Sequence, residues 1–423
     1  MSPNIELLSP AGSLEKLKFA AEYGADAVYA GAPSFSLRNK AENFTPEQFT
    51  QAVEYLHQRN KKLFLAANIF FHNEDLSGFE DYLKRAVPLG FDGIILSDLG
   101  MIDLVRERYP DLDVHVSTQA NTTNKASARV YQKMGVKRIV LARELTLSEI
   151  REIRDAVDLE LEAFVHGAMC ISYSGRCLLS NYFSQELGRK GGMRDANRGD
   201  CTQVCRWEFA LTEESRPGEY FPVEQDQYGT AILSSRDLNM APHLNDLLEA
   251  GVSSFKIEGR MRSAWYVAAT TRVYRHALDC ALRGEESDPV ILAELQRISH
   301  RAYSTGFYYQ KDRASDAEGS LSGYPRRNGT QEQLMLALVE KVEGNTLTGR
   351  AMNPLRSGTT IQTLNPNFGD GTLRNFTLRV GGEVREMVRP TESFELQCDD
   401  EAMSAMGPLS LLLQTSPVFT TSS

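Results

Sequence analysis

The chain has 423 residues, of which 42% are hydrophobic and 24% are charged. These values are typical of a globular protein and exclude a disordered chain, and the length predicts two or three domains. The net charge of −10 excludes a wholly basic nucleic-acid binder, although not a local basic patch. No apolar run reaches the ~18 residues of a membrane helix, and the first residues do not resemble a signal peptide. We therefore expect a cytoplasmic protein with no membrane partner.

Residues 1–285 alternate short apolar runs with helical stretches. Ser13, Thr45 and Thr146 are the expected helix N-caps, the last of them in a capping box with Glu149. Strands that alternate with helices predict a parallel sheet, and eight units fit a closed (β/α)8, TIM-like barrel. An open doubly wound sheet is the weaker alternative, because no strand is followed by a Gly-rich dinucleotide motif. The expected strands are 6–9, 27–30, 63–68, 93–97, 114–117, 138–142, 161–165 and 255–258.

The regular spacing is interrupted once, between the seventh and eighth expected strands. This Cys-rich insertion, at about 166–235, holds four of the six cysteines and two strand-like runs, 206–211 and 230–234, that predict a hairpin. Residues 286–333 form a polar segment, in which we expect a helix at 289–302 and then a linker. In residues 334–423, short strands separated by turns predict a small C-terminal all-β barrel domain.

The strongest chemical signal is the group of four cysteines in the insertion: Cys170, Cys177, Cys201 and Cys205. Clustered thiolates favour zinc or an iron–sulfur cluster. Only the second pair has the Cys-x2–4-Cys spacing of structural zinc sites. Buried, unpaired cysteines are the third possibility. Cys280 and Cys398 lie apart in the sequence, and we expect them to be structural.

Polar residues follow the expected strands at the end of the barrel where active sites of this fold lie. Each alone could form a salt bridge, a helix cap or a buried hydrogen bond, but together they predict a polar pocket. Arg143 and Arg260 suit bidentate binding of a carboxylate or phosphate. His166 precedes Cys170 by four residues, so it is a catalytic candidate or a hydrogen-bonding support for the cysteines. The full set is Ser9, Arg38, Asn68, Asp98, Gln119, Arg143, Glu144, His166, Glu258 and Arg260.

Two roles are assigned within this set. His166, Arg143, Glu258 and Arg260 are the catalytic candidates, and Arg38, Asn68 and Gln119 are candidates for holding a bound small molecule or cofactor. The insertion also carries basic residues that could grip a phosphate backbone, although a solvated loop would look the same. Residues 184–206 hold five basic residues against three acidic ones, the basic set being Arg189, Lys190, Arg194, Arg198 and Arg206.

Residues 162–180 read EAFVHGAMCISYSGRCLLS and resemble the signature of peptidase family U32, the collagenase-like proteases. The blocks ELLSPAG at 6–12, GADAVYAG at 24–31 and FKIEGR at 255–260 resemble further motifs of this family. The resemblance is to members that modify RNA. It implies an enzyme that hydroxylates the wobble uridine of tRNA to 5-hydroxyuridine without dioxygen, in a prephenate-dependent route.

The same resemblance implies a [4Fe–4S] cluster on Cys170, Cys177, Cys201 and Cys205. It also implies the tRNA anticodon loop as a partner and an electron partner that the sequence does not identify. Prephenate is a small dicarboxylate, which Arg143 and Arg260 would suit. Two other functions stay open: a U32-type peptidase that uses a cysteine nucleophile, and a non-catalytic RNA-binding module with a structural metal. The His-Glu-x-x-His and Gly-x-Ser-x-Gly motifs of hydrolases do not occur.

Overall fold

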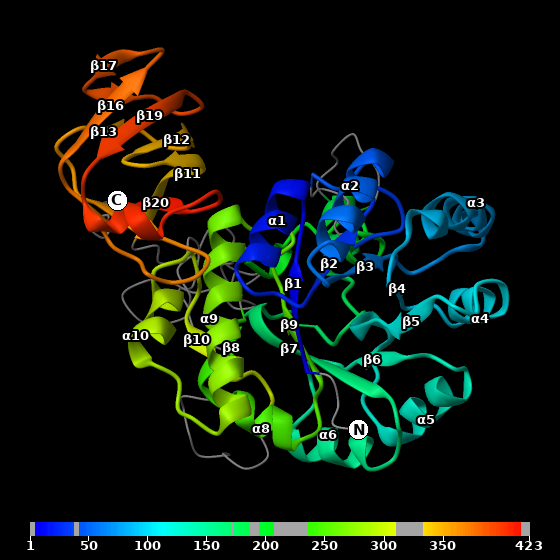
Figure 1. Ribbon diagram of the computed structural model, residues 1–423. Helices are drawn as coiled ribbons and strands as arrows, with labels where there is room; N and C mark the ends of the chain where they lie inside the picture. The colour runs from blue at the N-terminus through cyan, green and yellow to red at the C-terminus, as the bar shows by residue number, and fades with distance from the viewer. Residues whose placement is uncertain are drawn as a thin grey trace, which may run out of the picture.

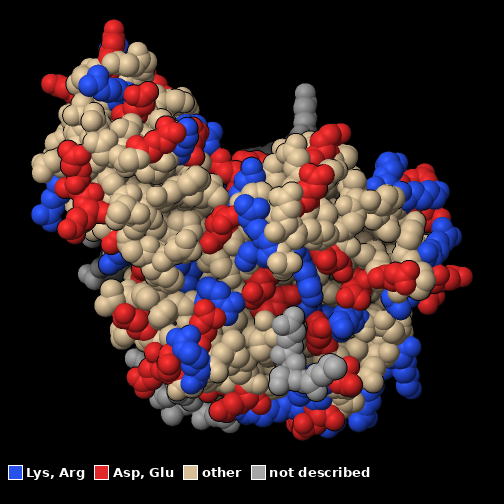
Figure 2. All heavy atoms as spheres, viewed as in Figure 1, with Lys and Arg blue, Asp and Glu red and all other residues tan. Residues whose placement is uncertain are grey.

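The computed structural model describes residues 5–37, 42–170, 172–186, 194–206, 235–309 and 333–415. A barrel of strands and helices is joined to a C-terminal β domain, and helix α9 (Ala264–Arg283) lies at the side of the barrel that faces this domain (Figure 1). Acidic and basic side chains are mixed over the face of the molecule in Figure 2. None of the described helices is both long and apolar enough to cross a membrane.

The barrel is closed by eight parallel strands, which confirms the expected TIM-like fold. Neighbouring strands pair in sequence order from β1 to β7, and β9 pairs with both β7 and β1. The apolar residues on the outside of the strands pack against the helices in one large core. The barrel strands are β1 (Glu6–Pro10), β2 (Ala27–Gly31), β3 (Lys62–Ala66), β4 (Gly93–Leu96), β5 (Asp113–Val116), β6 (Arg138–Val140), β7 (Glu160–Ala168) and β9 (Ser254–Ile257).

The helices around the barrel begin where the sequence predicts. Ser13, Thr45 and Thr146 each accept a hydrogen bond from a backbone N–H of the first turn, and Thr45 and Thr146 form capping boxes. Helix α9 follows β9 and is buried along most of its length. The other barrel helices are α1 (Leu14–Glu22), α2 (Pro46–His57), α3 (Leu76–Ala86), α4 (Leu99–Arg108), α5 (Lys125–Lys133), α6 (Leu147–Arg154) and α8 (Leu244–Glu249).

Two short strands extend the sheet beyond the barrel. Strand β7 has nine residues, and its last part pairs in antiparallel fashion with β8 (Asp237–Asn239), which pairs in turn with β10 (Tyr303–Ser304). The helix expected at 289–302 is shorter: α10 (Pro289–Leu292) and one 3-10 turn end at Gln296. Asp237 accepts hydrogen bonds from the backbone and guanidinium of Arg301. These bonds attach the residues just before β10 to β8. The expected hairpin, 206–211 and 230–234, lies outside the described residues except for Arg206, which ends a 3-10 turn.

The barrel interior contains a network of buried charges near the amino ends of the strands. Arg138, 4% exposed, donates to Glu6 Oε1 at 2.6 Å and to Glu162 Oε2 at 2.9 Å. Lys256 Nζ lies 2.7 Å from the other oxygen of Glu162. Because each charge has an opposite partner and hydrogen bonds, the cost of burying it is offset. These residues were not expected to meet, since each looks like an isolated polar residue in its own strand.

The C-terminal domain is an antiparallel half-barrel with its own apolar core. Its main sheet has the order β15-β14-β20-β11-β12-β19-β16-β17, and β13 pairs with β18. The sequence predicts strands at 336–342, 346–351, 359–363, 376–380, 384–388 and 409–413, and β19 has no counterpart among them. The strands are β11 (Gln333–Glu343), β12 (Thr346–Ala351), β13 (Leu355–Arg356), β14 (Ile361–Leu364), β15 (Thr372–Leu373), β16 (Phe376–Val380), β17 (Glu383–Arg385), β18 (Met387–Val388), β19 (Ser393–Cys398) and β20 (Leu411–Thr415).

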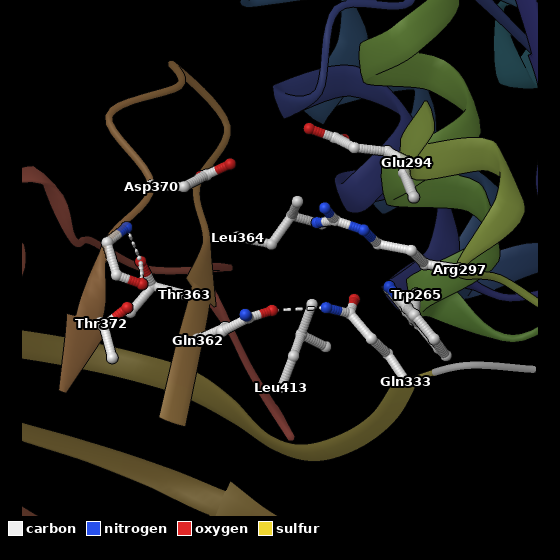
Figure 3. A pocket seen from close by; sticks show the side chains of 12 residues that line it. Trp265, Glu294, Arg297, Gln333, Gln362, Thr363, Leu364, Asp370, Thr372 and Leu413 are labelled. Atoms are coloured by element: carbon white, nitrogen blue, oxygen red, sulfur yellow. Dashed lines mark hydrogen bonds between the residues drawn. The ribbon is translucent and has the colours of Figure 1, made fainter. Parts of the chain in front are cut away.

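The two domains meet around Arg272 of α9, whose side chain is 1% exposed. Its guanidinium binds Glu294 at 2.5 Å and Asp370 of the β domain at 2.6 Å. A cavity of about 230 Å³ lies beside this joint. Figure 3 shows Trp265 on the barrel side of this cavity, and Gln333 and Gln362, which hydrogen-bond to each other at 2.5 Å. We refer to it as the interdomain cavity.

Candidate active site at the barrel rim

A second cavity, of about 60 Å³, lies at the carboxyl ends of the barrel strands, and we call it the rim cavity. Five of the sequence-predicted site residues line it: Asn68, Gln119, Arg143, Glu258 and Arg260. They come from segments that follow different strands, so only closure of the barrel brings them together. The remaining lining residues are Tyr29, Leu37, Ala66, Ile95, Ser117, Thr118, Phe164 and Lys256.

Arg260 is a buried cation at the edge of this cavity. Its guanidinium donates to Ser36 Oγ at 2.5 Å and to Asn43 Oδ1 at 2.9 Å. Gly31, at the end of β2, leaves room for this guanidinium. A Cβ on residue 31 would lie 2.4 Å from Arg260 Nη2. The contacts with two neutral side chains fix the orientation of the guanidinium.

Two segments hold the cysteines: the first, at 170–186, holds Cys170 and Cys177, and the second, at 194–206, holds Cys201 and Cys205. Arg143 links the rim cavity to the first cysteine segment. Its guanidinium carbon lies 3.9 Å from the ring centre of Phe164, and its Nη1 lies 3.9 Å from Cys170 Sγ. Among the described residues, no carboxylate forms an ion pair with Arg143. A cation in this position is suited to an anionic ligand that enters the cavity.

Asn68, Gln119 and Glu258 complete the polar lining. Asn68 donates to Ser117 Oγ at 3.2 Å, which orients its amide toward β5. Glu258 donates its backbone N–H to the carbonyl of His166 and accepts from the Tyr266 hydroxyl at its own carbonyl. Arg38, which was also expected at the rim, lies outside the described residues.

Lys256 is a site residue that our sequence reasoning missed. It lines the floor of the rim cavity, and burial lowers the pKa of its ammonium group, although the nearby Glu162 carboxylate opposes this shift. The signal that could have found it is the alternation of a strand, because Lys256 lies two residues before Glu258 and so faces the same side.

His166 is not brought to the rim cavity. Phe164 pairs with Lys256, but His166 pairs with Ile257, so a bulge between them turns the His166 side chain to the outside of the barrel. There its ring contacts Tyr266, Tyr274 and Tyr303, and Nδ1 lies 3.3 Å from the Tyr274 hydroxyl. Burial lowers the pKa of His166 to about 3, so the ring is neutral at physiological pH. The expectation that it faces the pocket is therefore wrong.

Three other polar residues at strand ends have structural roles. Ser9 hydrogen-bonds to Thr271 of α9 at 2.9 Å. Asp98 caps helix α4 by accepting from the backbone of Met101. Glu144 accepts from the backbone and hydroxyl of Ser174, so it fixes the first cysteine segment to the barrel.

The two cysteine segments pack on each other and on the rim. Asn197 donates to the carbonyl of Cys177 at 2.8 Å, and the backbone of Thr202 donates to Ser180 at 3.1 Å. Gly175 has a positive φ of 71°, and a Cβ there would lie 2.2 Å from the carbonyl oxygen of Gln119. Only glycine allows this close approach. Helix α7 (Leu179–Glu186) forms the last part of the first segment.

Two basic residues of the insertion are engaged in ion pairs. Arg198 binds Asp75 at 2.7 Å, which ties the second cysteine segment to the loop after β3, and it holds the pKa of Asp75 below its ordinary value. Arg194 binds Asp200 at 2.6 Å. Arg189 and Lys190 lie outside the described residues, as does the side chain of Arg206. Exposed aromatic rings, Tyr173 and Tyr182, also lie in this region.

The four cysteines of the insertion are exposed or partly exposed, whereas Cys280 and Cys398 are buried. Four thiols on two segments in contact are the donor set that an iron–sulfur cluster or zinc requires. In the described parts of the chain, however, no three Cys, His, Asp or Glu residues form a group that could hold a metal ion. The donor chemistry therefore fits a cluster, while the side-chain geometry is not assembled for one.

The barrel and the cysteine segments match a known protein family. The model of peptidase family U32 matches residues 12–318. The chain belongs to peptidase family U32. The matched region includes both cysteine segments and every described residue of the rim cavity, so the site lies within the part of the chain that the family shares.

Relatives with different names share this region. The chain is 37% identical over 413 residues to tRNA hydroxylation protein P of Escherichia coli, an alignment that covers 88% of each chain. It is 43% identical over 332 residues to an uncharacterized protease of Methanocaldococcus jannaschii, covering 76% of this chain and 78% of that one. A 23S rRNA 5-hydroxycytidine synthase of Escherichia coli is 35% identical over 71% of this chain and 43% of its own length.

Proposed function

We propose that this protein is an RNA-modifying enzyme that hydroxylates the wobble uridine of tRNA to 5-hydroxyuridine. The observation that carries the proposal is the contact of Arg143 with both the rim cavity and Cys170, which places a polar pocket beside the thiols. The similarity to a tRNA hydroxylation protein along 88% of both chains supports the same function.

The proposed cofactor is a [4Fe–4S] cluster held by Cys170, Cys177, Cys201 and Cys205. When bound, such a cluster would supply electron transfer beside the rim cavity. The protein itself contributes the packing of the two cysteine segments on the rim, and Arg143 as a positive group next to one thiol. An electron partner is part of the proposal, since the cluster must be reduced or oxidised from outside.

Metal analysis tests the cofactor. Anaerobically purified protein is expected to contain about 4 iron atoms per chain. Replacing any of the four cysteines of the insertion by Ala should remove most of the iron. Cys280→Ala and Cys398→Ala are the matched controls and should leave the iron content unchanged, because these thiols are buried elsewhere. Protein that contains zinc and no iron would contradict the proposed cofactor.

The proposed small-molecule partner is prephenate or a related dicarboxylate in the rim cavity. Two guanidinium groups, Arg143 and Arg260, border this cavity and can each bind a carboxylate through two hydrogen bonds. Asn68 and Gln119 offer neutral hydrogen-bonding groups to the rest of such a ligand. Arg38 remains a candidate in the same role.

The proposed macromolecular partner is the anticodon loop of tRNA. Unpaired bases of a loop stack on aromatic side chains, and Tyr173 and Tyr182 are 63% and 64% exposed on the cysteine segments beside the rim. Arg189 and Lys190 would bind the phosphates. Tyr173→Ala should weaken tRNA binding by about 1–3 kcal/mol. Replacing Arg189 and Lys190 by Gln should reduce the slope of the salt dependence by about 1 for each phosphate that is no longer bound.

Nucleoside analysis of tRNA tests the proposed function as a whole. A strain that lacks this gene should lose 5-hydroxyuridine, and a plasmid carrying the wild-type gene should restore it. Unchanged 5-hydroxyuridine in the deletion strain would contradict the proposal. A variant that binds tRNA normally but restores no modification would exclude a purely non-catalytic RNA-binding module.

A peptidase is the second candidate, supported by the family name and by the protease-named relative. A cysteine peptidase needs a histidine within hydrogen-bonding distance of an accessible thiol. His166 does not fill this role, because it faces away from the rim. The thiol of Cys280 lies 3.6 Å from His276 Nε2, but Cys280 is 3% exposed within α9 and out of reach of a peptide. These positions favour the RNA-modifying enzyme.

A further inference from the structure

Lys256 is a buried amine on the floor of the rim cavity, and the proposed function does not use it. Its side chain is 5% exposed, and Nζ lies 2.7 Å from Glu162 Oε1. The same nitrogen lies 4.4 Å from the ring centre of Tyr29 and 5.5 Å from that of Phe164, and both rings line the cavity. The amine is therefore held by a carboxylate toward the barrel interior, while the side chain borders the cavity.

The surroundings of Lys256 favour a reactive amine. Burial lowers the pKa of Lys256 despite the opposing Glu162 carboxylate, and the positive charges of Arg138 and Arg143 add to the lowering. A lower pKa increases the fraction of neutral amine, which is the form that attacks a carbonyl carbon. Few water molecules can reach a side chain that is this strongly buried, so a bond that water would hydrolyse is protected.

The cations around Lys256 indicate the class of ligand. Arg143 and Arg260 border the same cavity, and a guanidinium fork is suited to a carboxylate. A 2-oxo acid carries a carboxylate directly next to a carbonyl. It would place its carboxylate against a guanidinium and its carbonyl carbon near the lysine, which satisfies both kinds of group in one small molecule.

We propose that Lys256 is the nucleophile of an imine-forming site and that the rim cavity binds a 2-oxo acid covalently. A bond forms between Lys256 Nζ and the carbonyl carbon, the carbon–oxygen double bond breaks, and the oxygen leaves as water. The ammonium group and the protonated imine carry the same charge, so the ion pair with Glu162 is kept. The step needs no oxidant or reductant. The inference rests on the proposed function only in treating the rim cavity as the active site.

Borohydride trapping of the full-length protein tests the inference. Pyruvate, the simplest stable 2-oxo acid, is added with borohydride, which reduces an imine to a stable secondary amine. The intact mass should show one adduct per chain, and peptide mapping should place it on Lys256. Lactate, which has the carboxylate but no carbonyl, is the matched control ligand and should give no adduct. Lack of any adduct with pyruvate would overturn the inference.

Two lysine variants separate a built site from general lysine reactivity. Lys256→Arg keeps the positive charge beside Glu162 but cannot form the imine, so labelling should be lost. Lys61 is the matched control: it is half-buried, its pKa is also lowered by burial, and it lies before β3, outside the cavity lining. Lys61→Arg should label like the wild type. If labelling is lost in Lys61→Arg, or if peptide mapping finds adducts on many lysines, the inference is overturned.

The expected contact between Arg143 and the carboxylate of the 2-oxo acid is tested by the pyruvate concentration that labelling requires. Arg143→Gln should raise the pyruvate concentration needed for half-maximal labelling by ~30-fold, the effect expected for removing one hydrogen bond between charged groups. The trapping needs neither RNA nor iron, so it fails independently of the proposed function. Protein that hydroxylates tRNA but is never trapped contradicts only the imine, and protein that is trapped but leaves tRNA unmodified contradicts only the RNA function.

Discussion

The interdomain cavity and the rim cavity are both lined by charged side chains, but their charges are balanced in different ways. At the interdomain cavity, Arg272 is bound by two carboxylates from different parts of the chain. At the rim cavity, Arg143 contacts an aromatic ring and a thiol, and it forms no ion pair among the described residues. The charge of Arg272 is already neutralised by carboxylates of the protein, so this residue stabilises the contact between the domains. Arg143 has neutral neighbours, so it can bind an anionic ligand. The contact beside the larger cavity is therefore a structural joint, and the smaller cavity is the candidate site.

The largest expected effect comes from breaking the joint. Arg272→Met should lower the free energy of unfolding by about 3 kcal/mol, because the buried guanidinium loses its charge-assisted hydrogen bonds to the partly exposed carboxylates of Glu294 and Asp370. Urea unfolding measures this loss. The matched control is Arg385→Ala, which removes an exposed ion pair with Glu383 and should cost at most about 1 kcal/mol. Equal effects of the two variants would show that the joint does not depend on its buried ion pairs.

At the rim, the expected effect is on function and not on folding. Arg143→Lys should reduce the proposed tRNA hydroxylation by ~30-fold or more, since a lysine cannot reproduce the planar contact with a carboxylate. Its urea unfolding midpoint should stay near that of the wild type. Arg151→Lys, at an exposed position on α6, is the matched control and should keep full activity. A variant with unchanged activity would place the anion elsewhere.

A smaller effect is expected where a glycine keeps the rim open. Gly31→Ala would put a methyl group 2.4 Å from Arg260 Nη2, so the guanidinium or the strand must move. We expect a loss of about 1–3 kcal/mol in the free energy of unfolding, together with reduced activity. Gly78→Ala is the matched control: its Cβ would meet Phe35 at 3.7 Å, and alanine in helix α3 should be neutral or stabilising. Similar losses in both variants would show that crowding at Arg260 is not the cause.

The smallest effect is a pH dependence at the contact that ties the second cysteine segment to the barrel. Arg198 lowers the pKa of Asp75, so this pair stabilises the fold above the ordinary aspartate pKa of ~3.9, and the stabilisation is lost as the pH falls through the lower value in the folded state. Asp75→Asn should cost about 1 kcal/mol at pH 7. The difference from the wild type, measured by urea unfolding, should shrink toward pH 3. A difference that is constant with pH would contradict the ion pair as its source.

The sequence alone was sufficient for the fold of the barrel and for family membership. Alternation of apolar runs with capped helices predicts eight parallel strands, because both signals depend on residues close together in the chain. Thr146 and Glu149, for example, form a capping box that needs only one turn of helix. The family motifs at 162–180 and 255–260 are equally local. The rim positions of Asn68, Gln119, Arg143, Glu258 and Arg260 also follow from a local rule, that loops after barrel strands share one end.

Only the tertiary structure decided which of the rim candidates face the cavity and which cation is neutralised. His166 was expected beside Arg143, but one bulge in β7 turns it outward, and no pattern in the sequence marks that bulge. Lys256 and Glu162 pair across strands that are 94 residues apart, and Arg272 meets Asp370 across 98 residues. A side chain's partner over such distances depends on strand register and domain packing. These are set by the sum of many contacts, so the composition and spacing of single segments cannot reveal them.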